Sequence, residues 1–249
     1  MALRWSKMDK KEILGYDILS TNYDEFLDNI MTELKSNTKI VISAVNPNKI
    51  VMAEKNDELS TALQKSDYLI PDGYGIILLS KFKKKPIKKR ITGIDTMLKI
   101  CSLAKDSKLK VFLFGATETV IKKTRQNLEM QYPGLKIVGA ECGYNYDNIC
   151  LIKKINQSKA DVLFVGHGSP QQELWIYNNK NNLNVKLYLG VGGSFDVISG
   201  NIKRAPVVIQ NIGLEWLYRI VKQPYRIKNV KIFVDFLSII IKDNKRKRK

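Results

Sequence analysis

The stretch VLFVGHGSPQQELWI at residues 162–176 decides the fold class, because a strand, a glycine turn and the start of a helix follow one another within it. Residues 162–165 are a short run of Val, Leu and Phe, which is typical of a strand covered on both faces. Gly166 and Gly168 interrupt the run, and helical spacing of apolar side chains predicts a helix over 170–180. The stretch therefore predicts one parallel strand and the helix that carries the chain back across the sheet.

The same unit recurs in both directions along the chain. Predicted strands lie at 39–45, 68–70, 111–114, 137–140 and 187–189. Predicted helices lie at 22–35, 47–66, 74–82, 93–106, 118–131 and 148–157, with Thr21 and Thr92 as helix N-caps. This alternation predicts an α/β fold, with a mostly parallel sheet and helices on both of its faces.

The pattern changes near residue 200, where the strand signals stop. Two helices are predicted, at 207–221 and 226–242, on either side of Pro224. In the second helix, six apolar residues fall on one face: Val230, Phe233, Val234, Leu237, Ile240 and Ile241. With the basic tail KRKRK, this helix suits the headgroup region of an anionic bilayer, and packing on the main domain or on another subunit is the alternative. We therefore expect a main domain over 1–202 and a basic, membrane-associating helical appendage over 203–249.

The excess of positive charge narrows the choice of partners. The 249 residues include 42 Lys and Arg against 24 Asp and Glu, a net charge of +18. Residues 202–249 hold 13 of the basic and 3 of the acidic residues, and KFKKKPIKKR at 81–90 holds seven more basic ones. Such patches attract nucleic acid, an anionic membrane or a phosphate-rich substrate. Nucleic acid is the least favoured, because Phe82 is the only aromatic residue of the 81–90 cluster and the tail has none.

Several kinds of site are disfavoured by residue content. Cys101, Cys142 and Cys150 have no C-x-x-C spacing, so we expect reduced, mostly buried thiols rather than a disulfide framework or a zinc site. His167 is the only histidine, and we expect it to be non-catalytic. The chain has no P-loop, no G-x-S-x-G elbow and no D-x-D pair. We therefore expect neither a cofactor nor a metal.

No segment is predicted to cross a membrane or to direct secretion. No apolar stretch approaches the roughly 20 residues that a spanning helix needs. The N-terminal residues MALRWSKMDKKEIL contain no apolar segment of the kind that a signal peptide has. We therefore expect a cytoplasmic protein.

Small and polar residues follow five of the predicted strands. Asn46 follows 39–45, Asp72 follows 68–70, and glycine-containing loops begin at Gly115, Gly166 and Gly190. Because ligands of doubly wound sheets bind beyond the carboxyl ends of the strands, these loops predict a shared site. Asp72 is the candidate general base, and the alternative is that it caps helix 74–82. If the donor is a nucleotide sugar, cationic side chains or backbone amides must stabilise the leaving diphosphate.

Seven blocks, in this order, resemble the WecG/TagA/CpsF family of bacterial glycosyltransferases. They are VNPNKIVMAEK (45–55), IPDGYGI (70–76), RITGID (90–95), VFLFGA (111–116), VLFVGHGSPQQELWI (162–176), LGVGGSFDVISGNIKRAP (189–206) and GLEWLYRIVKQPYRI (213–227). The resemblance implies a Rossmann-like domain that transfers a sugar from a UDP donor with inversion and without metal. The acceptor that it implies is GlcNAc on a polyprenyl diphosphate at the inner face of the cell membrane, and the donated sugar is N-acetylmannosamine in teichoic acid synthesis. Relatives that transfer N-acetylmannosaminuronic acid or other hexoses into capsule or exopolysaccharide are the alternative.

The resemblance also implies roles for single residues. Asp72 matches the proposed base, and Arg219 and Arg226 match arginines that close over the donor diphosphate. The implied substrate-binding residues are Asn46, Arg90, Gln172, Gly192, Gly193, Ser194, Asp196, Arg219 and Arg226. Ala44 departs from the family, which has threonine there, so the donor sugar stays open.

Two functions of other classes compete with this one. The first is a basic α/β protein that binds nucleic acid, and the second is a non-catalytic scaffold for wall enzymes at the membrane. The partners that we expect are a UDP-sugar, a polyprenyl-diphosphate-linked sugar and an anionic membrane surface, without nucleic acid. A homo-oligomer is compatible with the sequence.

Overall fold

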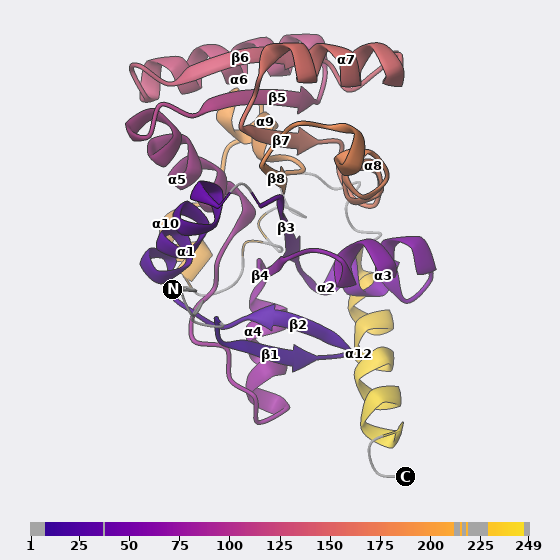
Figure 1. Cartoon of the computed structure of the whole chain (residues 1–249). Coiled ribbons are helices and arrows are strands. Elements are labelled where there is room, and N and C mark those ends of the chain that lie inside the picture. Colours follow the sequence, from indigo (N-terminus) through magenta and orange to yellow (C-terminus); the bar gives the residue numbers. More distant parts are fainter. Residues whose placement is uncertain (1–7, 37, 212–214, 216–217, 219–228, 247–249) are drawn as a thin grey trace.

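The fold is built on one eight-stranded sheet with the strand order β1-β2-β4-β3-β8-β7-β5-β6 (Figure 1). The computed structural model describes residues 8–36, 38–211, 215, 218 and 229–246. Neighbouring strands run parallel, except for β1 and β2, which form an antiparallel hairpin at one edge. The strands are β1 (Lys10–Ile13), β2 (Tyr16–Leu19), β3 (Ile40–Val45), β4 (Tyr68–Pro71), β5 (Lys110–Gly115), β6 (Lys136–Glu141), β7 (Val162–Gly166) and β8 (Leu187–Gly190).

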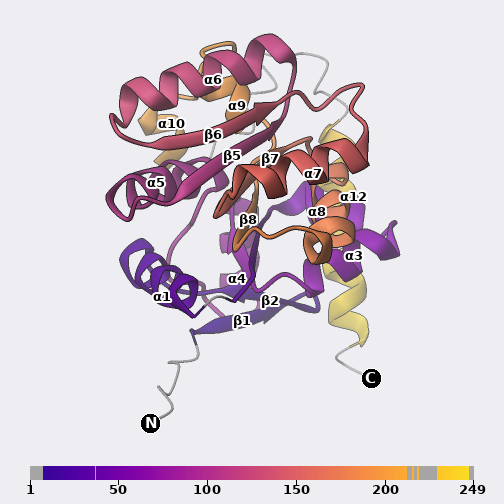
Figure 2. The same ribbon diagram turned by 45° about the horizontal axis from the view of Figure 1, so that its top comes forward.

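Helices cover both faces of the sheet, as the sequence predicts (Figure 2). One face packs against α1 (Tyr23–Lys35), α5 (Gly93–Asp106), α6 (Glu118–Gln131) and α9 (Ser194–Ile198). The other packs against α2 (Pro47–Ala53), α3 (Asp57–Gln64), α4 (Tyr74–Phe82), α7 (Asn148–Ser158) and α8 (Gln171–Asn179). Strand β3 shows why its sequence is uniformly apolar: Ile40 and Ile42 enter the core on one face, whereas Val41 and Val45 enter two separate clusters on the other.

The six predicted strands and most of the predicted helices are confirmed. The hairpin of β1 and β2 was not predicted, although Leu14 and Gly15 form its two-residue turn with positive φ angles of 53° and 80°. Helix α9 was not predicted either, because its five residues follow the glycine loop after β8 without a visible helical period. Both omissions concern elements that are too short for periodicity to identify.

Two details of the predicted helices are wrong. The helix expected over 47–66 is divided into α2 and α3, because the Asn56 side chain accepts a hydrogen bond from the Leu59 amide and caps a new helix. The N-cap of α1 is Asn22 rather than Thr21, since the Asn22 side chain accepts from the Glu25 amide at 2.9 Å. Thr92 caps α5 as predicted.

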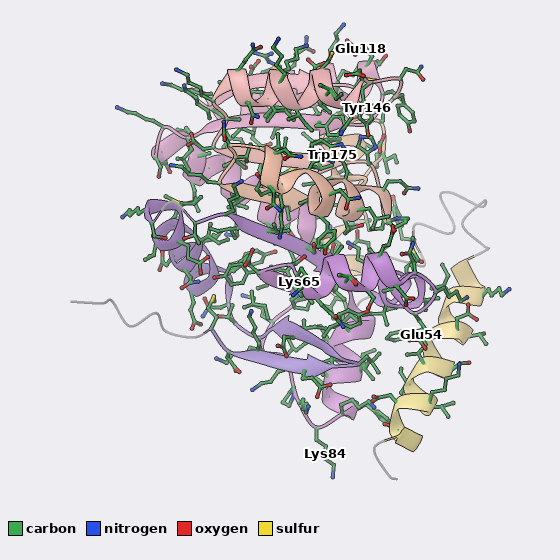
Figure 3. All side chains as sticks on the ribbon, turned by 45° about the vertical axis from the view of Figure 1, so that its right-hand side comes forward. Glu54, Lys65, Lys84, Glu118, Tyr146 and Trp175 are labelled. Atoms are coloured by element: carbon green, nitrogen blue, oxygen red, sulfur yellow. The ribbon has the colours of Figure 1, made fainter. Side chains whose placement is uncertain are left out.

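The last part of the chain returns to the main domain. Helix α10 (Val207–Asn211) lies within the predicted 207–221 helix. Helix α12 (Asn229–Arg246) contains the described part of the predicted 226–242 helix and extends beyond its predicted end, whereas 226–228 lie outside the described residues. Helix α12 lies along α2 (Figures 1 and 3). Its Phe236 side chain is buried in the core cluster that α2, α3 and α4 share. Among the residues that the structure describes, no helix is long and apolar enough to cross a membrane.

Candidate active site

A polar cavity of about 160 Å³ lies at the carboxyl ends of β3, β4 and β8. It is lined by Ala44, Asn46, Lys49, Asp72, Arg90, Thr92, Gly93, Ile94, Ser169, Gln172, Gly190, Val191, Gly192, Gly193, Ser194, Val197, Arg204 and Glu215. The loops that the sequence singles out after three strands therefore meet in one place, as expected for a doubly wound sheet. Three cationic side chains, Lys49, Arg90 and Arg204, contribute to the lining.

Asp72 lies at this cavity, and it does not cap α4. The N-cap of α4 is Gly73, which has no side-chain capping hydrogen bond. The Oδ2 atom of Asp72 instead accepts a hydrogen bond from the Gly93 amide at 3.2 Å. Its Oδ1 atom lies 3.7 Å from Nη2 of Arg90, and about a quarter of the side chain is exposed. The carboxylate thus contacts Gly93 through one oxygen and Arg90 through the other, at the lining of the cavity.

Arg90 links Asp72 to the last part of the chain. Its Nη2 donates to Oε2 of Glu215 at 2.9 Å, and its guanidinium stacks 5.2 Å from the ring centre of Tyr74. The Arg90 and Glu215 side chains are only 17% and 11% exposed. Among the described residues, Nε of Arg90 is buried without a hydrogen-bond partner. This arginine therefore has a donor left for a further acceptor.

Gln172 is fixed at both ends of its amide. Its Nε2 donates to Oε1 of Glu173 at 2.7 Å, and its Oε1 accepts from the Gly192 amide at 2.8 Å. The same Glu173 oxygen forms a buried ion pair with Lys49 at 2.6 Å. A Cβ atom at Gly190 would lie 2.7 Å from Nε2 of Gln172, so a larger residue there would displace the Gln172 amide. The network holds the glycine loop after β8 against the first turn of α8.

Arg204 is held by Asp95 in a two-pronged ion pair with N–O distances of 2.6 and 2.8 Å. Burial alone would raise the pKa of Asp95, but the hydrogen bonds from Arg204 and Thr92 outweigh it and keep that pKa below its usual range. Hydrogen bonding to Asp95 likewise raises the pKa of Arg204. Arg204 therefore contributes a fixed, permanently charged guanidinium group to the lining of the cavity.

Most of the site residues that the sequence predicts do come together. The cavity is lined by Asn46, Asp72, Arg90, Gln172, Gly192, Gly193 and Ser194. Asp196 lies on α9 beside the loop, with its Oδ2 3.9 Å from where a Cβ of Gly193 would be, but it is not part of the lining. Arg219 and Arg226 lie outside the described residues.

Sequence reasoning missed four charged residues at this site: Lys49, Asp95, Arg204 and Glu215. All four stand inside the quoted blocks, in VNPNKIV, RITGID, NIKRAP and GLEWLYR. Their pairings join parts of the chain that are 109 to 125 residues apart, and no local spacing announces such contacts. Of the four, Lys49 could have been predicted from its position. It follows the cap residue Asn46 by one helical turn, so it faces the same end of the sheet.

A second, wider cavity of about 560 Å³ lies beside the first, between the loop after β6, α7 and α8. Its lining is uncharged, with aromatic side chains and several amides: Gly143, Tyr146, Asn148, His167, Gln171, Leu174, Trp175, Asn178 and Asn179. Tyr146 and Trp175 are labelled in Figure 3. The Trp175 indole donates to Asn148 at 2.8 Å, which donates in turn to Asn179 at 3.0 Å. The polar groups of this cavity are thus held in place before any ligand enters.

His167 belongs to the second cavity. Its ring packs against Phe114 and Tyr146, with ring centres 4.5 and 5.6 Å away. Burial lowers the pKa of His167, so the ring is neutral at pH 7. Nε2 is buried and has no hydrogen-bond partner in the described part of the chain. That His167 is non-catalytic stays a prediction.

The remaining sequence expectations about thiols and metals concern residues away from these cavities. Cys101 is buried, Cys142 is half-buried and Cys150 is exposed, and all three are free thiols. The expectation of mostly buried cysteines is therefore wrong for Cys150, which lies on the first turn of α7. In the described ranges, no group of three or more His, Cys, Asp or Glu side chains is arranged to hold a metal ion.

The sequence is similar to known proteins over nearly its whole length. The model of the glycosyl transferase WecG/TagA/CpsF family matches residues 11–249. The chain is 32% identical over 242 residues to the N-acetylglucosaminyldiphosphoundecaprenol N-acetyl-beta-D-mannosaminyltransferase of Bacillus subtilis (strain 168), covering 97% of this chain and 94% of that protein. It is 31% identical over 234 residues to the protein of the same name from Staphylococcus aureus (strain NCTC 8325 / PS 47), covering 92% of each.

Proposed function

The chain belongs to the WecG/TagA/CpsF family of glycosyltransferases, and on that basis we propose that it transfers N-acetylmannosamine from a UDP donor to GlcNAc on a polyprenyl diphosphate. Membership of the family makes it an enzyme that transfers a sugar. The names of its relatives supply the sugar and the acceptor, and the product would be the linkage unit of wall teichoic acid. The donor nucleotide, the stereochemistry and the roles of residues are part of the proposal.

One observation carries the proposal: the described lining of one cavity holds the Asp72 carboxylate, about a quarter exposed, together with three cationic side chains. An inverting transfer needs a base that takes the proton of the acceptor hydroxyl while the sugar–phosphate bond breaks. It also needs positive charge to stabilise the departing diphosphate. Asp72 would serve as the base, and Arg90 and Arg204 would face the diphosphate.

The two cavities suit the two ends of a nucleotide sugar. The polar cavity contains the charged residues and the amide of Gly193, which suit phosphate oxygens. The uncharged second cavity contains Tyr146, Trp175 and fixed amides, which suit a base and a ribose. The segment 168–172 separates them, since Ser169 and Gln172 line the first cavity and Gln171 lines the second. We propose that the donor lies across this segment.

The acceptor is a lipid, so we further propose that the protein binds peripherally to the inner face of the membrane. Helix α12 supports this, because Val234, Leu237 and Ile241 are exposed on it and are 58%, 43% and 57% accessible. Lys231 and Lys242 are exposed on the same helix. Exposed apolar side chains next to lysines are typical of helices that lie in an anionic headgroup layer.

A donor panel tests the proposed function. The full-length enzyme would be offered UDP-N-acetylmannosamine, UDP-N-acetylglucosamine, UDP-glucose and UDP-N-acetylmannosaminuronic acid with a short-chain GlcNAc-diphospholipid, and UDP release and the disaccharide lipid would be measured. We expect turnover with UDP-N-acetylmannosamine and an absolute requirement for the acceptor. Turnover with only one of the other donors would mean that the enzyme transfers that sugar instead of N-acetylmannosamine. UDP binding without turnover of any donor would favour the scaffold.

A second donor has one observation in its favour. Ala44, where the family has threonine, lines the cavity, and its Cβ lies 3.6 Å from where a Cβ of Gly93 would be. With alanine in place of threonine, the cavity wall beside Asp72 lacks one hydroxyl group. The uronic acid in the panel tests whether this change goes with a different sugar, and Ala44→Thr would then shift the preference toward N-acetylmannosamine.

A further inference from the structure

Each cation in the described lining of the polar cavity already has a carboxylate. Lys49 pairs with Glu173 at 2.6 Å, Arg204 pairs with Asp95 at 2.6 Å, and Arg90 pairs with Glu215 at 2.9 Å. With Asp72, these described residues comprise three positive and four negative charges. A diphosphate group, which carries about two negative charges, would therefore meet a described site with no surplus of positive charge.

The three pairs differ in what a ligand could reach. The Lys49–Glu173 pair is almost fully buried, with side chains 5% and 1% exposed, and Glu173 also fixes Gln172. The Arg204–Asp95 pair is two-pronged, and Asp95 lies outside the cavity lining. Glu215, in contrast, lines the cavity itself and holds Arg90 through a single nitrogen. Of the three paired carboxylates, Glu215 is therefore the one that a ligand in the cavity would meet.

Arg90 also has the geometry of an unfinished anion site. Its buried Nε has no hydrogen-bond partner among the described residues, although a buried donor without an acceptor costs about 1–3 kcal/mol. A guanidinium binds phosphate best through two parallel N–H groups. One phosphate oxygen pair could take Nε and Nη2 together, whereas the hydrogen bond from Arg90 to Glu215 uses Nη2.

We propose that Glu215 is a built-in competitor of the donor: its carboxylate occupies Arg90 until the diphosphate replaces it. This inference rests on the proposed function for the identity of the donor, and on the Arg90–Glu215 contact for the competition itself. The residue sets donor affinity rather than chemistry. Binding would exchange one carboxylate contact of Arg90 for a two-pronged phosphate contact, with no covalent step.

The inference predicts that removing a carboxylate from the site tightens binding of an anion. Glu215→Gln keeps the size of the side chain and removes its charge. If Glu215 holds Arg90 in most free molecules, the apparent affinity is reduced by the fraction in which Arg90 is available. We expect UDP and inorganic diphosphate to bind Glu215→Gln about tenfold more tightly than the wild type in calorimetry of the full chain.

Three further variants separate competition from general charge effects. Glu129→Gln removes an exposed carboxylate that pairs with Arg125 on α6, away from the cavity, and should leave both affinities unchanged. In an Arg90→Gln background, Glu215→Gln should no longer tighten binding. Glu215→Asp keeps the charge but shortens the reach to Arg90, and it should tighten binding by less than Glu215→Gln.

The outcomes distinguish this inference from the proposed function. Equal or weaker binding of UDP and diphosphate to both Glu215 variants overturns the competition and leaves the UDP donor standing. Tighter diphosphate binding to Glu215→Gln without UDP binding to any variant supports the competition and refutes the donor. Tightening that persists without Arg90 also overturns the competition, because the gain would then not come from this arginine.

Discussion

Asp72 is the residue whose replacement tests the chemistry most directly. Asp72→Asn keeps the acceptor oxygen for the Gly93 amide, and the N-cap of α4 is Gly73, so the melting temperature should hardly change. The rate should fall by about 10² to 10⁴, the usual contribution of a general base. UDP affinity should be nearly retained, because the carboxylate would face the acceptor.

Steady-state kinetics, UDP calorimetry and a thermal melt on the same preparation check this prediction. A variant that melts normally and turns over near the wild-type rate would refute Asp72 as the base. A large loss of stability would mean that the contact with Gly93 is more structural than its length of 3.2 Å suggests.

Asp95 gives a pH-dependent prediction at the same scale. The folded protein lowers its pKa, so the carboxylate contributes stability above its unfolded pKa of about 3.9, and that contribution is lost as the pH falls through the folded value. Asp95→Asn should cost about 1 kcal/mol at pH 7, a figure reduced because a third of the side chain is exposed. Urea unfolding from pH 7 to pH 3 should show the difference between wild type and variant shrinking. A difference that stays constant would contradict the role of its charge.

The sequence carries information about single residues very unevenly. Asn46 and Asp72 could be found because each follows a predicted strand, and the position beyond a parallel strand is informative in itself. Lys49, Arg204 and Glu215 could not be assigned a role, because their chemistry depends on partners 109 to 125 residues away. The seven blocks that resemble the family contain these residues, but the resemblance does not say which charged side chains pair with one another.

Helix α12 packs on the main domain, which is one of the two alternatives that the sequence offered, and it also leaves apolar side chains exposed. Ile232, Phe236, Ile239 and Ile240 face the main domain, and Val234, Leu237 and Ile241 are exposed. Ion pairs from Lys55 to Asp235 and from Lys83 to Asp243 tie the helix to the ends of α2 and α4. The predicted apolar face contains the three exposed residues together with Ile240, which faces the main domain. Periodicity therefore identified the apolar side chains of this helix but not which of them pack inward.

The exposed stripe of α12 predicts vesicle binding. The double variant Leu237→Ser, Ile241→Ser should melt as the wild type does, because both side chains are exposed, but should float poorly with vesicles that contain phosphatidylglycerol. Ile149→Ser is a matched control, since Ile149 is 78% exposed on α7 and should leave flotation unchanged. Equal flotation of all three proteins would remove the stripe from the membrane contact.

At the scale of the whole molecule, the sheet could be predicted and its order could not. Short apolar runs identified six strands, since buried parallel strands have no polar face. The order β4-β3-β8-β7-β5 depends on which helix covers which face, and no local pattern encodes that. The edge hairpin of β1 and β2 escaped because each strand has only four residues.

The charge arrangement of the whole site leads to a prediction about metal dependence. Transferases that hold a divalent ion on the donor diphosphate usually do so with paired carboxylates, and the chain has no D-x-D pair. The carboxylates described around the polar cavity are engaged by Arg90, Arg204 and Lys49, so a metal ion would have to compete with fixed cations for them.

We therefore expect the initial rate in millimolar EDTA to stay within about twofold of the rate without it, and added magnesium to change it little. Product formation by chromatography checks this on metal-stripped enzyme. Loss of activity in EDTA with recovery on magnesium or manganese would mean that the arginines do not suffice to stabilise the leaving diphosphate.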